Sequence, residues 1–208
     1  MSDSLQKELA DKIKELENKI EEAYETGKEK FSYELKHGKA IFNEEIKKLH
    51  KKEVKNLLVY FFNVPLGLYI SAPIIYAIFF PILLLDLFVT VYQWICMPIY
   101  KIPRVKRSDY ITFDRHRLKY LNIIEKINCL YCSYINGFIS YISEIAGRTE
   151  LFFCPIKHAR RLKKTHAHYN DFLDYGDYKN YKSEVSRLRS MFKELYEAEK
   201  KEKKTIKS

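Results

Sequence analysis

The sequence lacks the motifs by which most enzymes are recognised. It has no glycine-rich phosphate-binding loop, no Ser-His-Asp order and no carboxylate pair that would support a kinase or a hydrolase. An early apolar run, the mark of a secretory signal, is also missing, because the first fifty residues are polar. We therefore expect the four cysteines to be thiols or metal ligands rather than structural disulfides. These absences favour a binding or structural protein over an enzyme.

Formal charge is almost absent from one long segment. Between Leu57 and Tyr100 the only charged residue is Asp86, whereas both flanks are rich in Lys, Arg and Glu. Residues 1–56 are neutral overall, so the basic excess of the chain lies after this segment. One transmembrane helix needs about 20 apolar residues, and the segment therefore predicts two spans joined by a tight turn. A buried helix pair in a soluble protein is the alternative, but a chain of this length would have to cover the whole apolar segment.

The flanks of the apolar segment predict its orientation. Pro65, Pro73 and Pro81 argue against a single straight helix. "KKLHKKEVK" precedes the segment and "KIPRVKR" follows it, and such basic flanks stay in the cytoplasm. Both ends on one side require an even number of crossings, or a re-entrant hairpin that never crosses. Asp86 either marks a polar pathway, as in a small transport or channel component, or bonds to a neighbouring helix.

The two ends of the chain predict charged helices. From Asp3 to about Tyr24, apolar residues follow a 4-3-4-3 spacing that is interrupted at Gly27. This stripe predicts a short coiled coil with a second copy or with a partner protein. Its alternative is packing on the chain's own C-terminal helix, expected over about 178–203, after the break at Gly176.

A further amphipathic helix is predicted over about 117–145, from apolar residues at 3.6-residue spacing. Asn136-Gly137 between β-prone runs is a competing hairpin signal, but the apolar stripe continues in register on both sides of it. On this helix Cys129 and Cys132 lie on the polar face, where cysteines that only fill a core seldom sit.

The motif "CPIKH" provides the second half of a candidate metal site. Pro155 is typical of the first residue of a helix, so Cys154 would be the N-cap and His158 would follow one turn later. Three thiolates and one imidazole suit a tetrahedral zinc ion, or iron. The sequence thus predicts a metal site of Cys129, Cys132, Cys154 and His158. The alternatives are a redox dithiol of the first two cysteines and thiols without chemistry.

Two basic clusters follow the apolar segment, and we predict that they bind anionic lipid headgroups. Nucleic acid is the less favoured polyanion, because a membrane segment brings phospholipid headgroups nearer. The clusters are Lys101, Arg104, Lys106 and Arg107, and then Arg160, Arg161, Lys163 and Lys164.

The stretch "INCLYCSYINGFISYISEIAGRTELFFCPIKHARR", with "FLDYGD" after it, resembles an uncharacterised family of bacterial membrane-associated proteins. The resemblance covers roughly residues 102–177. It implies a bacterial protein and makes the cysteine–histidine set a family signature, but it implies no activity.

Together these patterns predict an all-α protein of the bacterial inner membrane with both termini in the cytoplasm. A hydrophobic hairpin would anchor amphipathic cytosolic helices that bind or scaffold other molecules. The expected regions are an N-terminal arm (1–55), the membrane hairpin (56–100), the Cys/His region (101–177) and a C-terminal charged helix with a basic tail (178–208).

Overall fold

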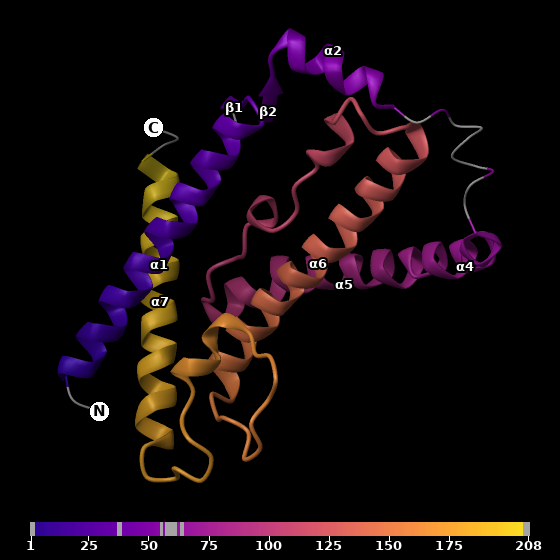
Figure 1. Cartoon of the computed structure of the whole chain (residues 1–208). Helices are drawn as coiled ribbons and strands as arrows, with labels where there is room; N and C mark the ends of the chain where they lie inside the picture. Colours follow the sequence, from indigo (N-terminus) through magenta and orange to yellow (C-terminus); the bar gives the residue numbers. More distant parts are fainter. Residues whose placement is uncertain (1–2, 37–38, 55, 57–61, 63–64, 206–208) are drawn as a thin grey trace. The chain divides into compact units, whose positions relative to one another are not determined.

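The computed structural model describes residues 3–36, 39–54, 56, 62 and 65–205, and most of them are helical (Figure 1). The chain divides into two compact units. The first comprises Met1–Asn63 and Asp114–Lys126, and the second comprises Val64–Phe113 and Ile127–Ser208. Because the second unit contains most of the predicted membrane segment and all four cysteines, it contains the candidate sites.

The first unit consists of helix α1 (Asp3–Lys30), strands β1 (Tyr33–Lys36) and β2 (Lys39–Phe42), helix α2 (Glu44–Lys52) and the short helix η2 (Arg115–Arg117). The predicted N-terminal helix is confirmed and continues past Gly27. The antiparallel strand pair was not predicted. It places Tyr33 opposite Phe42, and the Phe42 ring packs edge-on against His50 with ring centres 4.9 Å apart.

The second unit consists of helices α4 (Leu66–Ala77), α5 (Phe79–Tyr100), most of α6 (Ile123–Phe153) and α7 (Tyr181–Thr205), with short helices η1 (Arg107–Asp109) and η3 (Ala167–Asp171). Its core lies where α5, α6, α7 and the chain after α5 meet. The buried apolar side chains are Met97, Ile102, Val105, Ile111, Phe138, Tyr141, Ile145, Leu151, Phe172, Leu188 and Phe192.

Helices α4 and α5 follow one another without the turn that a hairpin needs (Figure 1). The residue between them, Ile78, has helical angles of φ −60° and ψ −22°. Leu66–Tyr100 therefore forms one helical run of 35 residues, which by length and composition is able to cross a membrane. Within residues 65–100 the predicted hairpin is wrong, and its residues 57–61 and 63–64 lie outside the described part of the chain.

The prolines explain why the prediction of a turn failed. Pro81 is the third residue of α5, in the first turn, where a backbone N–H has no partner within its own helix. Pro73 lies inside α4, which is tolerated when surrounding groups compensate for the lost hydrogen bond. Both prolines are thus compatible with a nearly continuous helix.

Helix α6 confirms the predicted amphipathic helix and rules out a hairpin at Asn136-Gly137, which lies near its middle. The helix begins with a reciprocal capping box. The Asn122 side chain accepts from the N–H of Glu125 at 3.0 Å, and the Glu125 carboxylate accepts from the N–H of Asn122 at 2.9 Å. Gly137 is needed for packing, since a Cβ there would lie 2.6 Å from the backbone oxygen of Tyr110.

The predicted helix at Pro155 does not form. Instead, Ile156 makes a parallel β-bridge with Leu173. The N–H of Lys157 donates to the carbonyl of Leu173 at 2.8 Å, and the N–H of Leu173 donates to the carbonyl of Pro155 at 2.9 Å. The predicted C-terminal helix is confirmed as α7. Gly176 precedes it with φ +91°, a left-handed conformation that glycine adopts most readily.

The contact at Gly137 generates a stability prediction. We expect Gly137→Ala to lower the free energy of unfolding by about 1–3 kcal/mol, because the new methyl group meets backbone that has no rotamer to change. Thermal unfolding of the detergent-solubilised protein, followed by circular dichroism, measures this loss.

Gly67→Ala in α4 is the matched control. A Cβ at Gly67, in the first turn of α4, meets nothing within 4 Å, so Gly67→Ala should cost no stability. Equal effects of the two substitutions would contradict the close approach of the chain to Gly137.

Candidate functional site

Helix α5 has two unlike faces. Asp86, Thr90 and Gln93 follow at i, i+4 and i+7 and therefore share one face, on which Met97 is fully buried. Of the most apolar stretch of Leu66–Tyr100, 6% is buried inside the protein, whereas a core helix of a soluble protein would be mostly buried. The exposed apolar side chains on the other side of α5 are Phe80, Leu84, Leu87, Phe88, Val91, Ile95 and Ile99, and we call them the outward face.

Asp86 is fully engaged with its own chain. Arg107 donates two hydrogen bonds to its carboxylate, one of them from Nη1 at 2.6 Å. The hydroxyl of Tyr134 donates at 2.6 Å, and that of Thr90 lies at 3.4 Å. Burial is the largest influence that raises the pKa of Tyr134 to about 12, and the Asp86 carboxylate adds to it. The phenol is therefore a proton donor to Asp86 at every physiological pH.

Arg107 comes from the chain that follows α5. Its guanidinium carbon lies 5.9, 5.9 and 5.8 Å from the ring centres of Tyr134, Phe138 and Tyr141, within the range of cation–π attraction. Arg107 bonds to Asp86 here, and Tyr134 gives Asp86 a bond to the neighbouring helix α6. Lipid binding by Arg107 and a transport role of Asp86 stay predictions.

Gln93, seven residues after Asp86, forms a second link between α5 and its neighbours. Its Oε1 accepts from the N–H of Val105 at 2.6 Å, and its Nε2 donates to the hydroxyl of Tyr141. With the Asp86 group, these contacts form what we call the polar seam: Asp86, Thr90, Gln93, Arg107, Tyr134 and Tyr141. The seam satisfies every polar side chain on the inner face of α5 between residues 86 and 93.

The end of α5 positions the chain for these contacts. Lys101 has the left-handed angles φ 56° and ψ 35°, and Ile102 donates from its N–H to the carbonyl of Met97 at 2.9 Å. This is the Schellman arrangement, in which glycine is the usual residue. It reverses the chain, so that Val105 and Arg107 run back along α5 toward Asp86.

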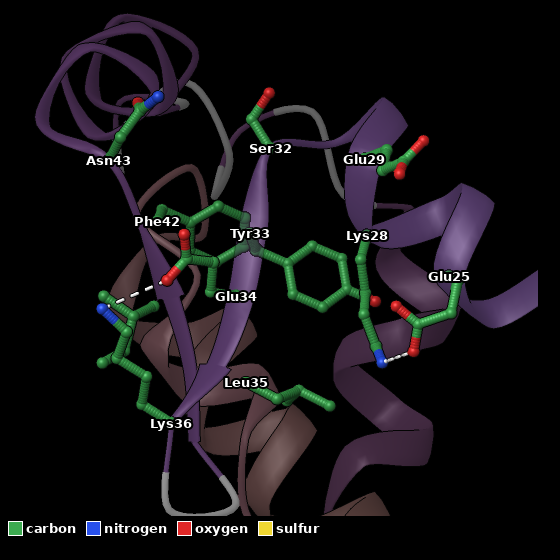
Figure 2. A pocket seen from close by; sticks show the side chains of 11 residues that line it. Glu25, Lys28, Glu29, Ser32, Tyr33, Glu34, Leu35, Lys36, Phe42 and Asn43 are labelled. Atoms are coloured by element: carbon green, nitrogen blue, oxygen red, sulfur yellow. Dashed lines mark hydrogen bonds and ion pairs between the residues drawn. The ribbon is translucent and has the colours of Figure 1, made fainter.

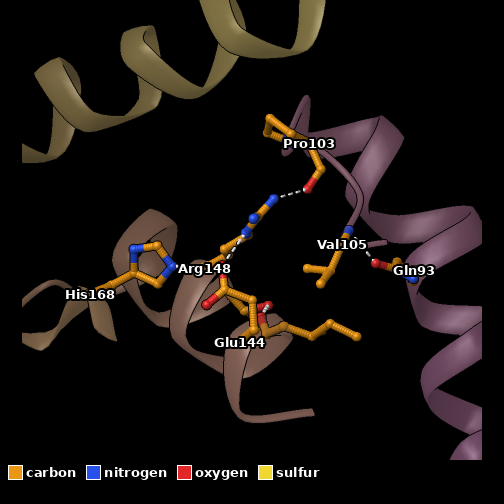
Figure 3. A network of polar contacts seen from close by, with 8 residues as sticks. Gln93, Pro103, Val105, Glu144, Arg148 and His168 are labelled. Atoms are coloured by element: carbon orange, nitrogen blue, oxygen red, sulfur yellow. Dashed lines mark hydrogen bonds and ion pairs between the residues drawn. The ribbon is translucent and has the colours of Figure 1, made fainter. Parts of the chain in front are cut away.

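A second polar network joins α6 to the loop around η3 (Figure 3). Arg148 donates to Glu144 at 2.7 Å and to the carbonyl of Pro103 at 2.9 Å. The Nε2 atom of His168 lies 2.9 Å from the same Glu144 carboxylate. Burial by itself raises the pKa of Glu144, but the hydrogen bonds from His168 and Arg148 outweigh it and lower the pKa below its ordinary value.

The structure does not bring the four predicted metal ligands together. Cys129 and Cys132 lie one turn apart on α6, whereas Cys154 follows the end of the same helix. At about 1.5 Å per residue, Cys132 and Cys154 are separated by roughly 30 Å, far more than one metal ion spans. His158 lies in the exposed segment after α6, where its ring stacks on Tyr169.

Other metal sites are also absent from the described residues: no group of three or more His, Cys, Asp or Glu side chains is arranged to hold an ion. Zinc or iron binding stays a sequence prediction that this arrangement does not support. The redox alternative needs only Cys129 and Cys132, both free thiols here, and it also stays a prediction.

The predicted lipid-binding cations fall into two groups. Lys101, Arg104 and Lys106 follow α5, and in the described structure none of them bonds to a carboxylate. The guanidinium carbon of Arg104 lies 4.3 Å from the ring centre of Trp94, which is 65% exposed. The second group, at 160–164, is an exposed non-helical loop that also presents Leu162.

A large hollow in the first unit, with a cavity volume of about 740 Å³, lies between the end of α1 and the β1–β2 pair (Figure 2). Four of its charged side chains form pairs: Lys28 with Glu25, and Lys36 with Glu34 at 3.1 Å. Exposed ion pairs of this kind contribute little free energy. The hollow is therefore a weaker candidate for a functional site than helix α5.

Comparison with known proteins finds no matching protein family, no similar curated protein and no similar solved structure. The resemblance to bacterial membrane-associated proteins stays a prediction, and the function is argued from the geometry alone.

The ion pair in the seam generates an asymmetric prediction. We expect Arg107→Gln to destabilise the protein more than Asp86→Asn, because Arg107 is the more exposed partner and its loss leaves a buried carboxylate. The double variant should recover part of the loss. Chemical unfolding of the four proteins in detergent measures the coupling. Strict additivity would show that the pair is not formed.

The Glu144 network generates a prediction about pH. A lowered pKa in the folded state means that this carboxylate stabilises the fold above its ordinary pKa, near 4.5. That contribution is lost as the pH falls through the lowered value. We expect Glu144→Gln to be less stable than the native chain at neutral pH, and the difference to shrink as the solution is acidified. Unfolding curves recorded across this range test it; a constant difference would contradict it.

Proposed function

We propose that the chain is a membrane-anchored helical scaffold protein. The outward face of α5, together with α4, inserts into the bilayer, while the rest of the second unit stays in the cytoplasm. The basic flanks and the resemblance to bacterial proteins favour the inner membrane, with both termini cytoplasmic.

The observation that carries the proposal is the contrast between the two faces of α5. Monomeric soluble proteins rarely expose a continuous apolar surface of this length. The exposed face extends over several helical turns, and the hydrogen bonds of Asp86, Thr90 and Gln93 are made on the opposite side. A bilayer would cover the outward face without disturbing the seam.

The cations beside α5 support an anionic membrane as the partner. Lys101, Arg104 and Lys106 lie in the chain that follows α5, without carboxylate partners in the described structure, and Arg104 lies over Trp94. Each such charge contributes about 1 kcal/mol near an anionic leaflet. Trp94 over Arg104 is typical of the interface, where amphipathic rings sit at the level of the headgroups. The exposed basic loop at 160–164 would add to the same attraction.

The scaffold part of the proposal is carried by α1. Its apolar stripe is exposed, with exposed fractions of 57% for Ile13, 59% for Leu16 and 58% for Ile20. This stripe fits an amphipathic helix of a second copy or of another protein, as the heptad-like spacing predicts.

The proposal is tested by flotation of the purified full chain with vesicles on a density gradient. We expect it to float with vesicles of phosphatidylglycerol and phosphatidylethanolamine. Leu84→Glu/Phe88→Glu should weaken this association at least tenfold, because a charge in the apolar part of a bilayer costs about 2–3 kcal/mol. Both side chains are exposed on the outward face, so the fold should survive.

Tyr178→Glu is the matched control, since Tyr178 is 79% exposed but lies outside α5; it should float normally. Vesicles of phosphatidylcholine alone should bind more weakly, and Lys101→Gln/Arg104→Gln/Lys106→Gln should remove this lipid preference. A native chain that stays at the bottom of the gradient in every lipid would refute the anchor.

A further inference from the structure

The direction of the α4–α5 helix relative to the membrane can be argued from the residues that lie beside it. This argument rests on the proposed membrane anchor and deepens it. A helical run of 35 residues is about 52 Å long, whereas the hydrocarbon core of a bilayer is about 30 Å thick. A perpendicular helix would leave about 20 Å of apolar surface outside the hydrocarbon.

The chain that follows α5 runs back alongside it. Val105 bonds to Gln93, and Arg107 bonds to Asp86. Asp86 is fourteen residues before Tyr100, where α5 ends, which corresponds to about 21 Å along the helix. Residues 105–109 therefore lie beside the middle of α5 rather than beyond its end.

That returning segment carries exposed charges. Lys106 and Asp109 are exposed, and they flank the residue that bonds to Asp86. If α5 crossed the bilayer with Tyr100 at the surface, the returning segment would lie beside Gln93 and Asp86, about 10–21 Å deep, and its charges would lie in the hydrocarbon core. Charged side chains at that depth are costly and rare. A crossing by this part of the helix is therefore disfavoured.

A crossing by the first part of the run alone meets a different conflict. Residues 66–85 have the length of one span, and Asp86 would then lie at the surface. The exposed side chains of Leu87, Phe88 and Ile95 would, however, remain in water.

Helix α6 adds a second conflict to that partial crossing. It also lies against this part of the run, since Tyr76 donates to Asn128 and Tyr131 donates to the carbonyl of Ile75. The next exposed turns of α6, with Cys132 and Asn136, would be brought into the bilayer together with it.

One orientation avoids all these conflicts. If the helix lies parallel to the membrane surface, the outward face meets the acyl chains over its whole length. The polar seam, α6 and the returning segment then lie together on the aqueous side. Arg104 and Trp94 fall at the edge between the two, at the level of the headgroups.

We propose that residues 66–100 form an in-plane anchor that lies in a single leaflet of an anionic bilayer and does not cross it. The membrane is the occupant of the outward face, and the cations of the returning segment contact its headgroups. Both termini then stay on the same side of the membrane without a hairpin, because no segment of this anchor passes through.

The only tryptophan of the chain makes the test direct. Phe80, Leu87 and Trp94 follow at seven-residue intervals and so share one side of α5, and all three are exposed. The single tryptophan is placed in turn at 94 (native), 87 (Leu87→Trp/Trp94→Phe) and 80 (Phe80→Trp/Trp94→Phe). Each full-length protein is incorporated into phosphatidylglycerol-containing vesicles with lipids brominated at a shallow, a middle or a deep acyl carbon.

We expect the three tryptophans to be quenched with the same depth profile, strongest for the shallow bromine. A depth that changes steadily from position 80 to position 94, by up to about 20 Å, would show a crossing and overturn the in-plane anchor while leaving membrane binding intact. Flotation without quenching at any of the three positions would also overturn it, because a second copy or another part of the chain would then cover the face.

Tyr178→Trp/Trp94→Phe is the control for the aqueous side, and no brominated lipid should quench it. A native chain that neither floats nor is quenched would refute the membrane anchor itself, so failure of the proposed function and failure of the in-plane orientation give different results.

Discussion

The bond between Asp86 and Arg107 is the interaction on which the arrangement of the second unit depends. A carboxylate on an apolar helix needs a partner, and Arg107 supplies it by returning along α5. The return requires the reversal at Lys101 and brings Ile102 and Val105 into the core. It also carries Tyr110 across α6, where the backbone fits only because residue 137 is glycine.

Periodicity predicted the parts of the fold that local sequence controls. The apolar spacing of α6 was a better guide than the hairpin signal at Asn136-Gly137. The apolar stripes near the two ends of the chain correctly predicted helices α1 and α7. The predicted boundaries of the helices were less accurate. Helix α6 continues eight residues past its predicted end at 145, which removes the turn that would have let two helices present Cys132 and Cys154 to one ion.

The features that were missed depend on contacts between distant residues. Pro155 is a sound local signal for a helix start, yet the bridge between Ile156 and Leu173 occupies the backbone groups that a helix would need. The spacing of Asp86, Thr90 and Gln93 was readable as one polar face. Their partners were not, because they depend on a chain reversal at Lys101, a residue type that seldom adopts left-handed angles.

The environment that suits α5 can be argued from the difference between its two faces. One face carries polar groups whose partners are all within the protein, and the other carries side chains that the protein leaves uncovered. In a soluble protein, the uncovered apolar face would lie in water. Full immersion in lipid would surround with hydrocarbon the charges that lie beside the polar face. The boundary between water and hydrocarbon that we propose suits both faces along the same length of helix. The unequal faces of this one helix therefore argue for a place at the membrane surface more strongly than its apolar composition argues for a crossing.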